Sequence, residues 1–82
     1  MDLMYKLYLL NDDVHSFDDV VSILKRYLGY TLIHGCSIAE ITHTVGRCEI
    51  KSGDASEIEQ IYEVFTKNGF KVEIKEYGNE SI

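Results

Sequence analysis

Residues 5–21, YKLYLLNDDVHSFDDVV, contain the transition on which the fold of this chain depends. The run Tyr5–Leu10 is rich in aromatic and branched side chains, and it predicts a β-strand. Asn11-Asp12-Asp13 follows directly, and these residue types favour turns and helix starts. Ser16 predicts a helix N-cap, because Asp19 lies three residues further on and imitates the second half of a capping box. A strand, a polar turn and a capped helix are therefore expected in this one stretch.

Hydrophobic periodicity predicts the remaining elements. Apolar residues recur every three or four positions in the helices and every second position in the strands. Glycines are expected to end the helices, because glycine adopts the left-handed conformation at little cost. These patterns predict a strand over 5–10, a helix over 16–28, a helix over 31–45, a strand over 47–51, a helix over 54–68 and a strand over 70–75. The second helix is expected to bury Leu32, Cys36, Ala39 and His43.

The order β-α-α-β-α-β predicts an α+β fold. Three short strands are not stable alone, so we expect a two-layer sandwich with a three-stranded antiparallel sheet covered on one face by three helices. A chain of 82 residues fits a single domain over 1–82. Its ordered core is expected over about 5–76, with a frayed tail from Tyr77 to Ile82.

Charge and composition exclude several classes of partner and location. The net charge of −6 argues against nucleic acid, because phosphate binding needs a basic surface, but it suits a cationic partner such as a protonated amine. No run approaches the ~20 apolar residues that span a bilayer, and the first residues do not resemble a signal peptide. No membrane partner is therefore expected. Cys36 and Cys48 lie too far apart for a CxxC site, so we expect reduced thiols and a cytoplasmic protein.

The sequence does not predict an enzyme, a cofactor or a metal centre. It lacks a serine, histidine and acid in a recognisable catalytic order, and it lacks a glycine-rich phosphate loop. The possible metal ligands match none of the tight zinc spacings; they are His15, His34, His43, Cys36 and Cys48.

The Asn11-Asp12-Asp13 turn is the strongest candidate for a binding site. Adjacent carboxylate and amide oxygens can accept hydrogen bonds from an ammonium group. His43 lies near the end of the second predicted helix and can approach the turn if the two helices pack together. The residues alone leave a second interpretation open, in which the turn and the histidine are only structural.

The stretch from Tyr5 to Val21 resembles the opening of the ClpS family, the adaptors of ATP-dependent Clp proteases. In that family a strand ends in Asn-Asp-Asp, and the second helix ends in a histidine shortly before a glycine, as His43 and Gly46 do here. The predicted order of elements agrees with the family over about residues 5–76. His15-Ser16-Phe17 also resembles the ClpS-like domain of eukaryotic N-recognin ubiquitin ligases.

The resemblance implies an N-degron adaptor of the N-end rule, which binds a bulky hydrophobic first residue (Leu, Phe, Tyr or Trp) and delivers the protein to a Clp-family AAA+ ATPase. It implies that Asn11, Asp12 and His43 bind the peptide α-amine. Asp13, beside them, would support the turn or hold the peptide backbone. The implied hydrophobic pocket consists of Phe17, Val20, Ala39, Thr42 and Val72.

Some residues depart from the family pattern. Ala39 and Thr42 are smaller or more polar than usual, and Glu57 lies near a position where the family often has a lysine that helps to dock the ATPase. Only Met1 to Met4 precede the first strand, where the family has a long arm.

Two alternative functions remain open. One is an interaction module of the same fold without N-terminus-binding activity, comparable to the C-terminal domain of the ribosomal stalk protein. The other is a small amino-acid-sensing domain.

Overall fold

The computed structural model describes residues 3–78, and its helices and strands follow the predicted order β-α-α-β-α-β. This arrangement confirms the predicted α+β fold with an antiparallel three-stranded sheet. The elements are β1 (Leu3–Leu10), α1 (Phe17–Leu28), α2 (Leu32–Val45), β2 (Arg47–Gly53), α3 (Ala55–Lys67) and β3 (Val72–Gly78).

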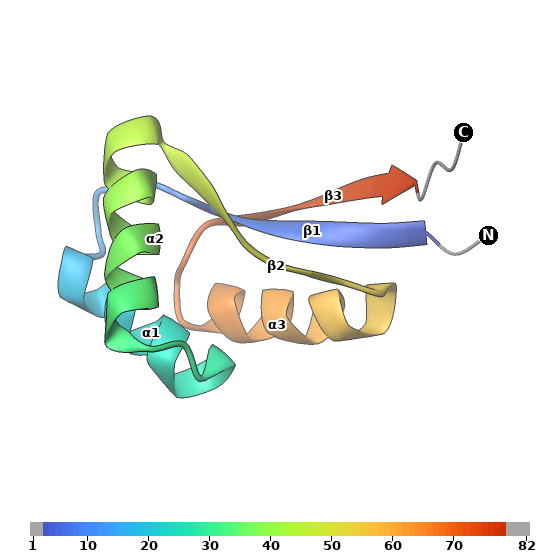
Figure 1. The fold of residues 1–82 in the computed structure, drawn as a ribbon, viewed down its shortest axis with the longest axis horizontal. Helices are drawn as coiled ribbons and strands as arrows, with labels where there is room; N and C mark the ends of the chain where they lie inside the picture. The colour runs from blue at the N-terminus through green and yellow to red at the C-terminus, as the bar shows by residue number, and fades with distance from the viewer. Residues whose placement is uncertain (1–2, 79–82) are drawn as a thin grey trace.

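The first strand of the sequence is the central strand of the sheet. The strand order is β2-β1-β3, and β1 pairs with both neighbours in antiparallel fashion. Leu7 and Leu9 alternate with partly exposed residues on β1 and are fully buried, so one face of the sheet supplies the core. Figure 1 shows α3 running along the sheet, while α1 and α2 gather at the end of the sheet far from the chain termini.

Four predicted strand boundaries are wrong, because pairing with the neighbouring strand determines them. β1 begins at Leu3 rather than Tyr5, β2 ends at Gly53 rather than Lys51, and both ends of β3 differ. β3 begins at Val72, so Phe70 precedes the strand, where the alternation had placed it inside. The prediction of a frayed tail fails for Tyr77 and Gly78, which pair with Met4 and Leu3 of the longer β1. Residues 79–82 of that predicted tail lie outside the described residues.

Polar side chains begin all three helices at the predicted residues. The Ser16 hydroxyl accepts a hydrogen bond from the Asp19 backbone N–H, and the Asp19 carboxylate accepts one from the Ser16 N–H, so the capping box is complete. Thr31 and Asp54 accept from backbone N–H groups in the first turns of α2 and α3. These contacts are local, which is why the sequence predicted them correctly.

The buried face of α2 differs from the predicted one. Leu32, expected in the core, is 62% exposed, and the buried residues are Gly35, Ile38, Ala39 and Thr42. A Cβ at Gly35 would lie 3.3 Å from Val21 Cγ1, so α1 and α2 approach closely at this glycine. Glycine and threonine add little to a hydrophobic pattern, and the pattern therefore missed the face that they form.

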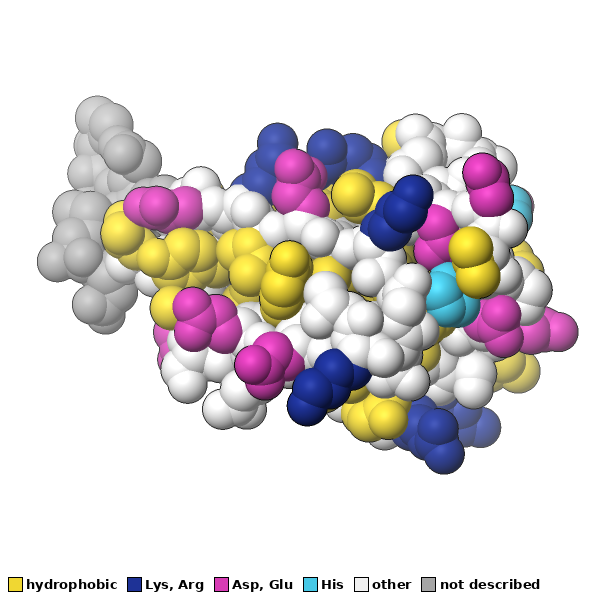
Figure 2. Space-filling model, turned by 180° about the vertical axis from the view of Figure 1, so that it is seen from behind, with side chains coloured by type: hydrophobic (Ala, Val, Ile, Leu, Met, Phe, Trp, Pro, Cys, Tyr) yellow, Lys and Arg dark blue, Asp and Glu magenta, His cyan; other side chains and the backbone are white. Residues whose placement is uncertain are grey.

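Charges of both signs are interspersed on the face shown in Figure 2, where histidine side chains reach the surface at the α1–α2 end. Within residues 3–78, no helix is long and apolar enough to cross a membrane.

Candidate functional site

Two backbone hydrogen bonds position the loop that follows β1. The Leu10 N–H donates to the Lys71 carbonyl at 2.9 Å, and the Asn11 N–H donates to the Gly46 carbonyl at 3.0 Å. Gly46 is the residue that ends α2, where it adopts a left-handed φ of 104°. The loop is therefore joined both to the end of α2 and to the segment that enters β3.

A small depression lies where these three segments meet. Its volume is about 10 Å³, which is room for about one water molecule. The lining residues are Leu10, Asn11, Asp12, His15, Val20, Thr42, His43 and Phe70. The structure thus brings Asn11, Asp12 and His43 to one depression, although His43 lies more than thirty positions along the chain from the turn.

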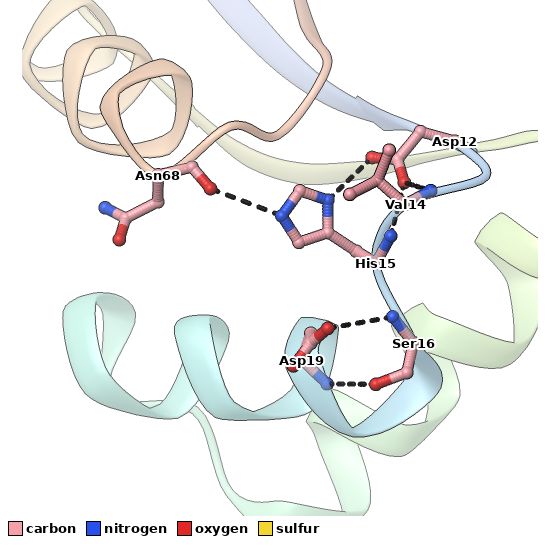
Figure 3. Close-up of polar contacts among 6 residues, drawn as sticks. All are labelled: Asp12, Val14, His15, Ser16, Asp19 and Asn68. Atoms are coloured by element: carbon pink, nitrogen blue, oxygen red, sulfur yellow. Dashed lines mark hydrogen bonds and ion pairs between the residues drawn. The ribbon is translucent and has the colours of Figure 1, made fainter.

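The Asp12 carboxylate organises its own loop (Figure 3). Oδ1 accepts the backbone N–H groups of Val14 at 2.8 Å and His15 at 2.7 Å, and Oδ2 lies 3.0 Å from Nδ1 of the His15 ring. A carboxylate has about four acceptor positions, so one remains on Oδ2 after these three contacts. The side chain is only 5% exposed. Asp12 also lines the depression, so a ligand in the depression lies against this carboxylate.

The pKa of Asp12 is lowered. Burial by itself would raise this pKa, but the hydrogen bonds from the His15 backbone, the His15 side chain and the Val14 backbone, together with the charge of His15, outweigh that effect. At neutral pH the depression therefore contains a fixed negative charge.

This lowered pKa predicts how Asp12 contributes to stability at different pH values. Because the folded pKa lies below the unfolded one, the contribution is complete above about pH 4 and is lost as the pH falls through the folded pKa. The free energy of unfolding of the wild type should exceed that of Asp12→Asn at about pH 5, where the Asp12 carboxylate is charged. The difference should shrink in acid, as urea denaturation at a series of pH values would show. A difference that grows in acid would contradict the assignment.

His43 and Phe17 flank the depression together. The two rings meet edge to face, with centroids 6.4 Å apart at an angle of 61°. His43 is exposed on α2 and lines the depression, whereas Phe17 is 38% exposed and does not line it. Phe17 is therefore in place to cover a ligand that contacts His43.

The other predicted pocket residues divide into two groups. Val20 and Thr42 are buried and line the depression. The Thr42 hydroxyl donates to the Ile38 carbonyl at 2.8 Å, so its hydrogen-bonding capacity is used within α2. The structure does not place Ala39 or Val72 at the depression: Ala39 is fully buried, and Val72 pairs with Leu9 in the sheet.

Phe70 and His15 are the residues that the sequence reasoning missed. Phe70 is buried and lines the depression, and the His15 ring stacks on it with centroids 3.7 Å apart at an angle of 17°. The strand alternation had assigned Phe70 to the sheet, and His15 had been considered as a metal ligand and as part of a family resemblance, but not as a residue that lines the binding site. An aromatic residue directly after the Asn68-Gly69 turn was the available signal.

Asp13 and Glu57 lie away from the depression. Asp13 is exposed, and its side chain makes no hydrogen bond or ion pair with the rest of residues 3–78. Glu57 lies in the first turn of α3, at the end of that helix far from α1, with its Oε2 3.6 Å from Lys51 Nζ. In the described part of the chain, no three His, Cys, Asp or Glu side chains converge as metal ligands would.

The fold and the depression together define a small α+β domain that gathers hydrogen-bond acceptors beside apolar side chains. The same fold is found in a solved structure of Agrobacterium tumefaciens ClpS2 bound to L-phenylalaninamide. The two structures superpose with a TM-score of 0.80 at 17% sequence identity, over 94% of this chain and 100% of that chain.

A comparison with protein-family models gives the family. Residues 1–73 match the family described as ATP-dependent Clp protease adaptor protein ClpS. The chain therefore belongs to the ClpS family, as the Asn-Asp-Asp turn and the helix-ending histidine had indicated. A search of curated proteins finds none that matches this sequence.

Proposed function

We propose that this protein binds the free N-terminus of substrate proteins whose first residue is bulky and hydrophobic, and that it delivers them to a Clp-family AAA+ ATPase. The observation that carries the proposal is the meeting of Asn11, Asp12 and His43 at one depression, beside the apolar side chains of Val20 and Phe70.

The three polar residues match the hydrogen-bonding needs of an α-ammonium group. Such a group has three N–H donors, and the residues that line the depression offer the Asn11 amide oxygen, the remaining acceptor position of Asp12 and a ring nitrogen of His43. Each charge-assisted hydrogen bond contributes roughly 1.5–3 kcal/mol, against an association cost of ~4–15 kcal/mol. With one buried hydrophobic side chain, we expect a Kd on the order of micromolar.

The ligand of the structural relative supports this chemistry. L-phenylalaninamide, which is bound to Agrobacterium ClpS2, carries a free α-amine, an aromatic side chain and an amide. These are the groups that the first residue of a protein presents. In this chain the ligand would be a protein N-terminus that places its amine against the Asn11-Asp12 turn and His43.

Delivery to the protease is part of the proposal, and Glu57 lies near the position where the family resemblance implies contact with the ATPase. The first turn of α3 lies at the opposite end of the molecule from the depression, so a bound N-terminus leaves that surface free (Figure 1). A glutamate presents the opposite charge to the lysine expected there, so we propose weaker docking to the usual ATPase or docking to an ATPase with a basic surface. A non-enzymatic role and a cytoplasmic location belong to the same proposal.

Peptides that differ only at the N-terminus test amine recognition. We expect saturable binding of Leu-, Phe-, Tyr- or Trp-initiated peptides in fluorescence anisotropy. N-acetylation should weaken it more than about 100-fold, because acetylation removes the charge and two N–H donors. A peptide of the same composition that begins with Asp serves as the control for the side-chain pocket. Equal binding of free and acetylated peptides would reject the amine site, and no binding of any peptide would favour the same-fold interaction module.

A further inference from the structure

The depression is too small for the ligand that the proposed function requires. A volume of about 10 Å³ holds about one water molecule, whereas Leu, Phe, Tyr and Trp side chains are all far larger. Binding such a side chain therefore requires part of the lining to move. The contacts of the lining residues indicate which part that is.

A second, larger hollow lies next to the depression. It has a volume of about 250 Å³ and lies along α1 on the side that faces the end of α3. The two hollows share two lining residues, His15 and Phe70, whose rings are stacked 3.7 Å apart. The stacked pair is therefore the wall between the two hollows. The remaining residues around the larger hollow are Asp19, Ser22, Ile23, Arg26, Tyr27 and Asn68.

His15 is the more easily displaced member of the pair. Phe70 is 7% exposed and also packs edge to face on Phe65, with centroids 5.9 Å apart. The His15 side chain is 15% exposed, and two hydrogen-bond acceptors hold its ring: Asp12 Oδ2 at Nδ1 and the Asn68 carbonyl at Nε2, 3.2 Å away. Figure 3 shows the ring between these two groups, above α1.

The hydrogen bonds of His15 cannot both form when the ring is neutral. A neutral imidazole has one N–H, so one of its two nitrogens then faces an acceptor without a proton between them. The charged groups around the ring are the Asp12 carboxylate and, across the larger hollow, Asp19 and Arg26. The ring is held by these two polar contacts and by stacking on Phe70, and Phe70 keeps its contact with Phe65 when the ring turns away.

We propose that the His15 ring is a movable wall that determines which first residue this protein accepts. When the ring turns away, the depression joins the larger hollow, and the combined pocket admits a bulky first side chain. Ile23, Tyr27 and Phe70 give this pocket apolar surface, and the Arg26 guanidinium is in place for a cation–π contact with an aromatic ring. The wild type favours Leu over Trp, because the smaller side chain requires less displacement of the wall. This inference rests on the proposed N-terminus binding.

Two substitutions of His15 distinguish the effect of its ring, which forms the wall, from the effect of its hydrogen bond with Asp12. Asn places an amide nitrogen at about the position of Nδ1, so His15→Asn keeps a contact with Asp12 and removes the ring. His15→Phe keeps a ring against Phe70 and removes the contact with Asp12. The readout is the ratio of Kd values for a Leu-initiated and a Trp-initiated peptide, in which the contribution of the shared α-amine cancels.

In His15→Asn, we expect the preference for the Leu-initiated over the Trp-initiated peptide to fall at least about fivefold relative to the wild type. In His15→Phe, we expect the ratio to stay within about twofold of the wild type while both peptides bind more weakly. An effect on loop structure alone would weaken both peptides equally and leave the ratio unchanged in both variants.

If the ratio is unchanged in His15→Asn while the wild type binds both peptides, the inference that His15 is a movable wall is wrong, and the proposed function is unaffected. If the wild type binds neither peptide, the proposed function fails, and this inference fails with it. Should His15→Asn not fold, as judged by circular dichroism, His15→Gln also removes the ring and leaves Phe70 unchanged, and the same shift toward Trp is then required.

Discussion

Asp12→Asn should weaken binding of a Leu-initiated peptide by about 10- to 100-fold while leaving the protein folded. The Asn oxygen can still accept the backbone N–H groups of Val14 and His15, which lie 2.8 and 2.7 Å from Oδ1. The Asn amide can donate to Nδ1 of His15, whose other nitrogen then donates to the Asn68 carbonyl. The loop therefore keeps its hydrogen bonds, but the charge that attracts the ammonium group is lost. Anisotropy titration would measure the change.

Asp13→Asn is the matched control for this prediction. It removes the same charge one residue further along, from a side chain that does not line the depression and makes no polar contact within residues 3–78. Its effect on affinity should stay below about threefold. Equal losses in the two variants would show that overall charge, rather than the position of the Asp12 carboxylate, attracts the peptide.

Phe65→Ala should lower the free energy of unfolding by about 3–5 kcal/mol. Phe65 is fully buried at the core-facing side of α3, so removal of its ring leaves a cavity in the core. In a domain of this size, such a loss corresponds to a fall in Tm of more than about 12 °C. The Phe65 ring also packs against Phe70, so the variant should bind peptide more weakly even below its Tm. Thermal and urea denaturation would measure the stability.

Tyr62→Ala removes an aromatic ring from the same helix at a position that is 36% exposed. It should cost no more than about 1 kcal/mol, because a surface ring leaves no sealed cavity. A similar loss for the two variants would indicate that helix propensity, rather than core packing at Phe65, determines the result.

The Asn-Asp-Asp turn combines structural and binding roles in one side chain. Asp12 uses three of its acceptor positions to order the loop, and the same side chain lines the depression. The bond from Asn11 to Gly46 fixes this loop against the end of α2, three residues beyond His43. The strand end and the helix end are therefore held together without any direct contact between Asp12 and His43 being required.

The sequence by itself determined the features that depend on neighbouring residues. The order of strands and helices, the caps at Ser16, Thr31 and Asp54 and the Asn-Asp-Asp turn all rest on hydrogen bonds or hydrophobic spacing within a few positions. The polar residues of the candidate site could be named from the sequence for the same reason. The turn and the helix-ending histidine are local motifs. The sequence did not show that the fold brings them close together, and this had to be assumed.

Only the tertiary structure decided the features that depend on residues far apart in the chain. The central place of β1 and the extension of β3 to Gly78 follow from strand pairing across most of the chain length. The wall of the depression depends on the contact between His15 and the Asn68 carbonyl, 53 positions away in the sequence. It also depends on Phe70, which precedes β3 and stacks on the His15 ring. Of the residues expected to form the hydrophobic pocket, Val20 and Thr42 line the depression. The sequence does not determine the others, because packing between distant segments, rather than any local pattern, selects the side chains that enclose a cavity.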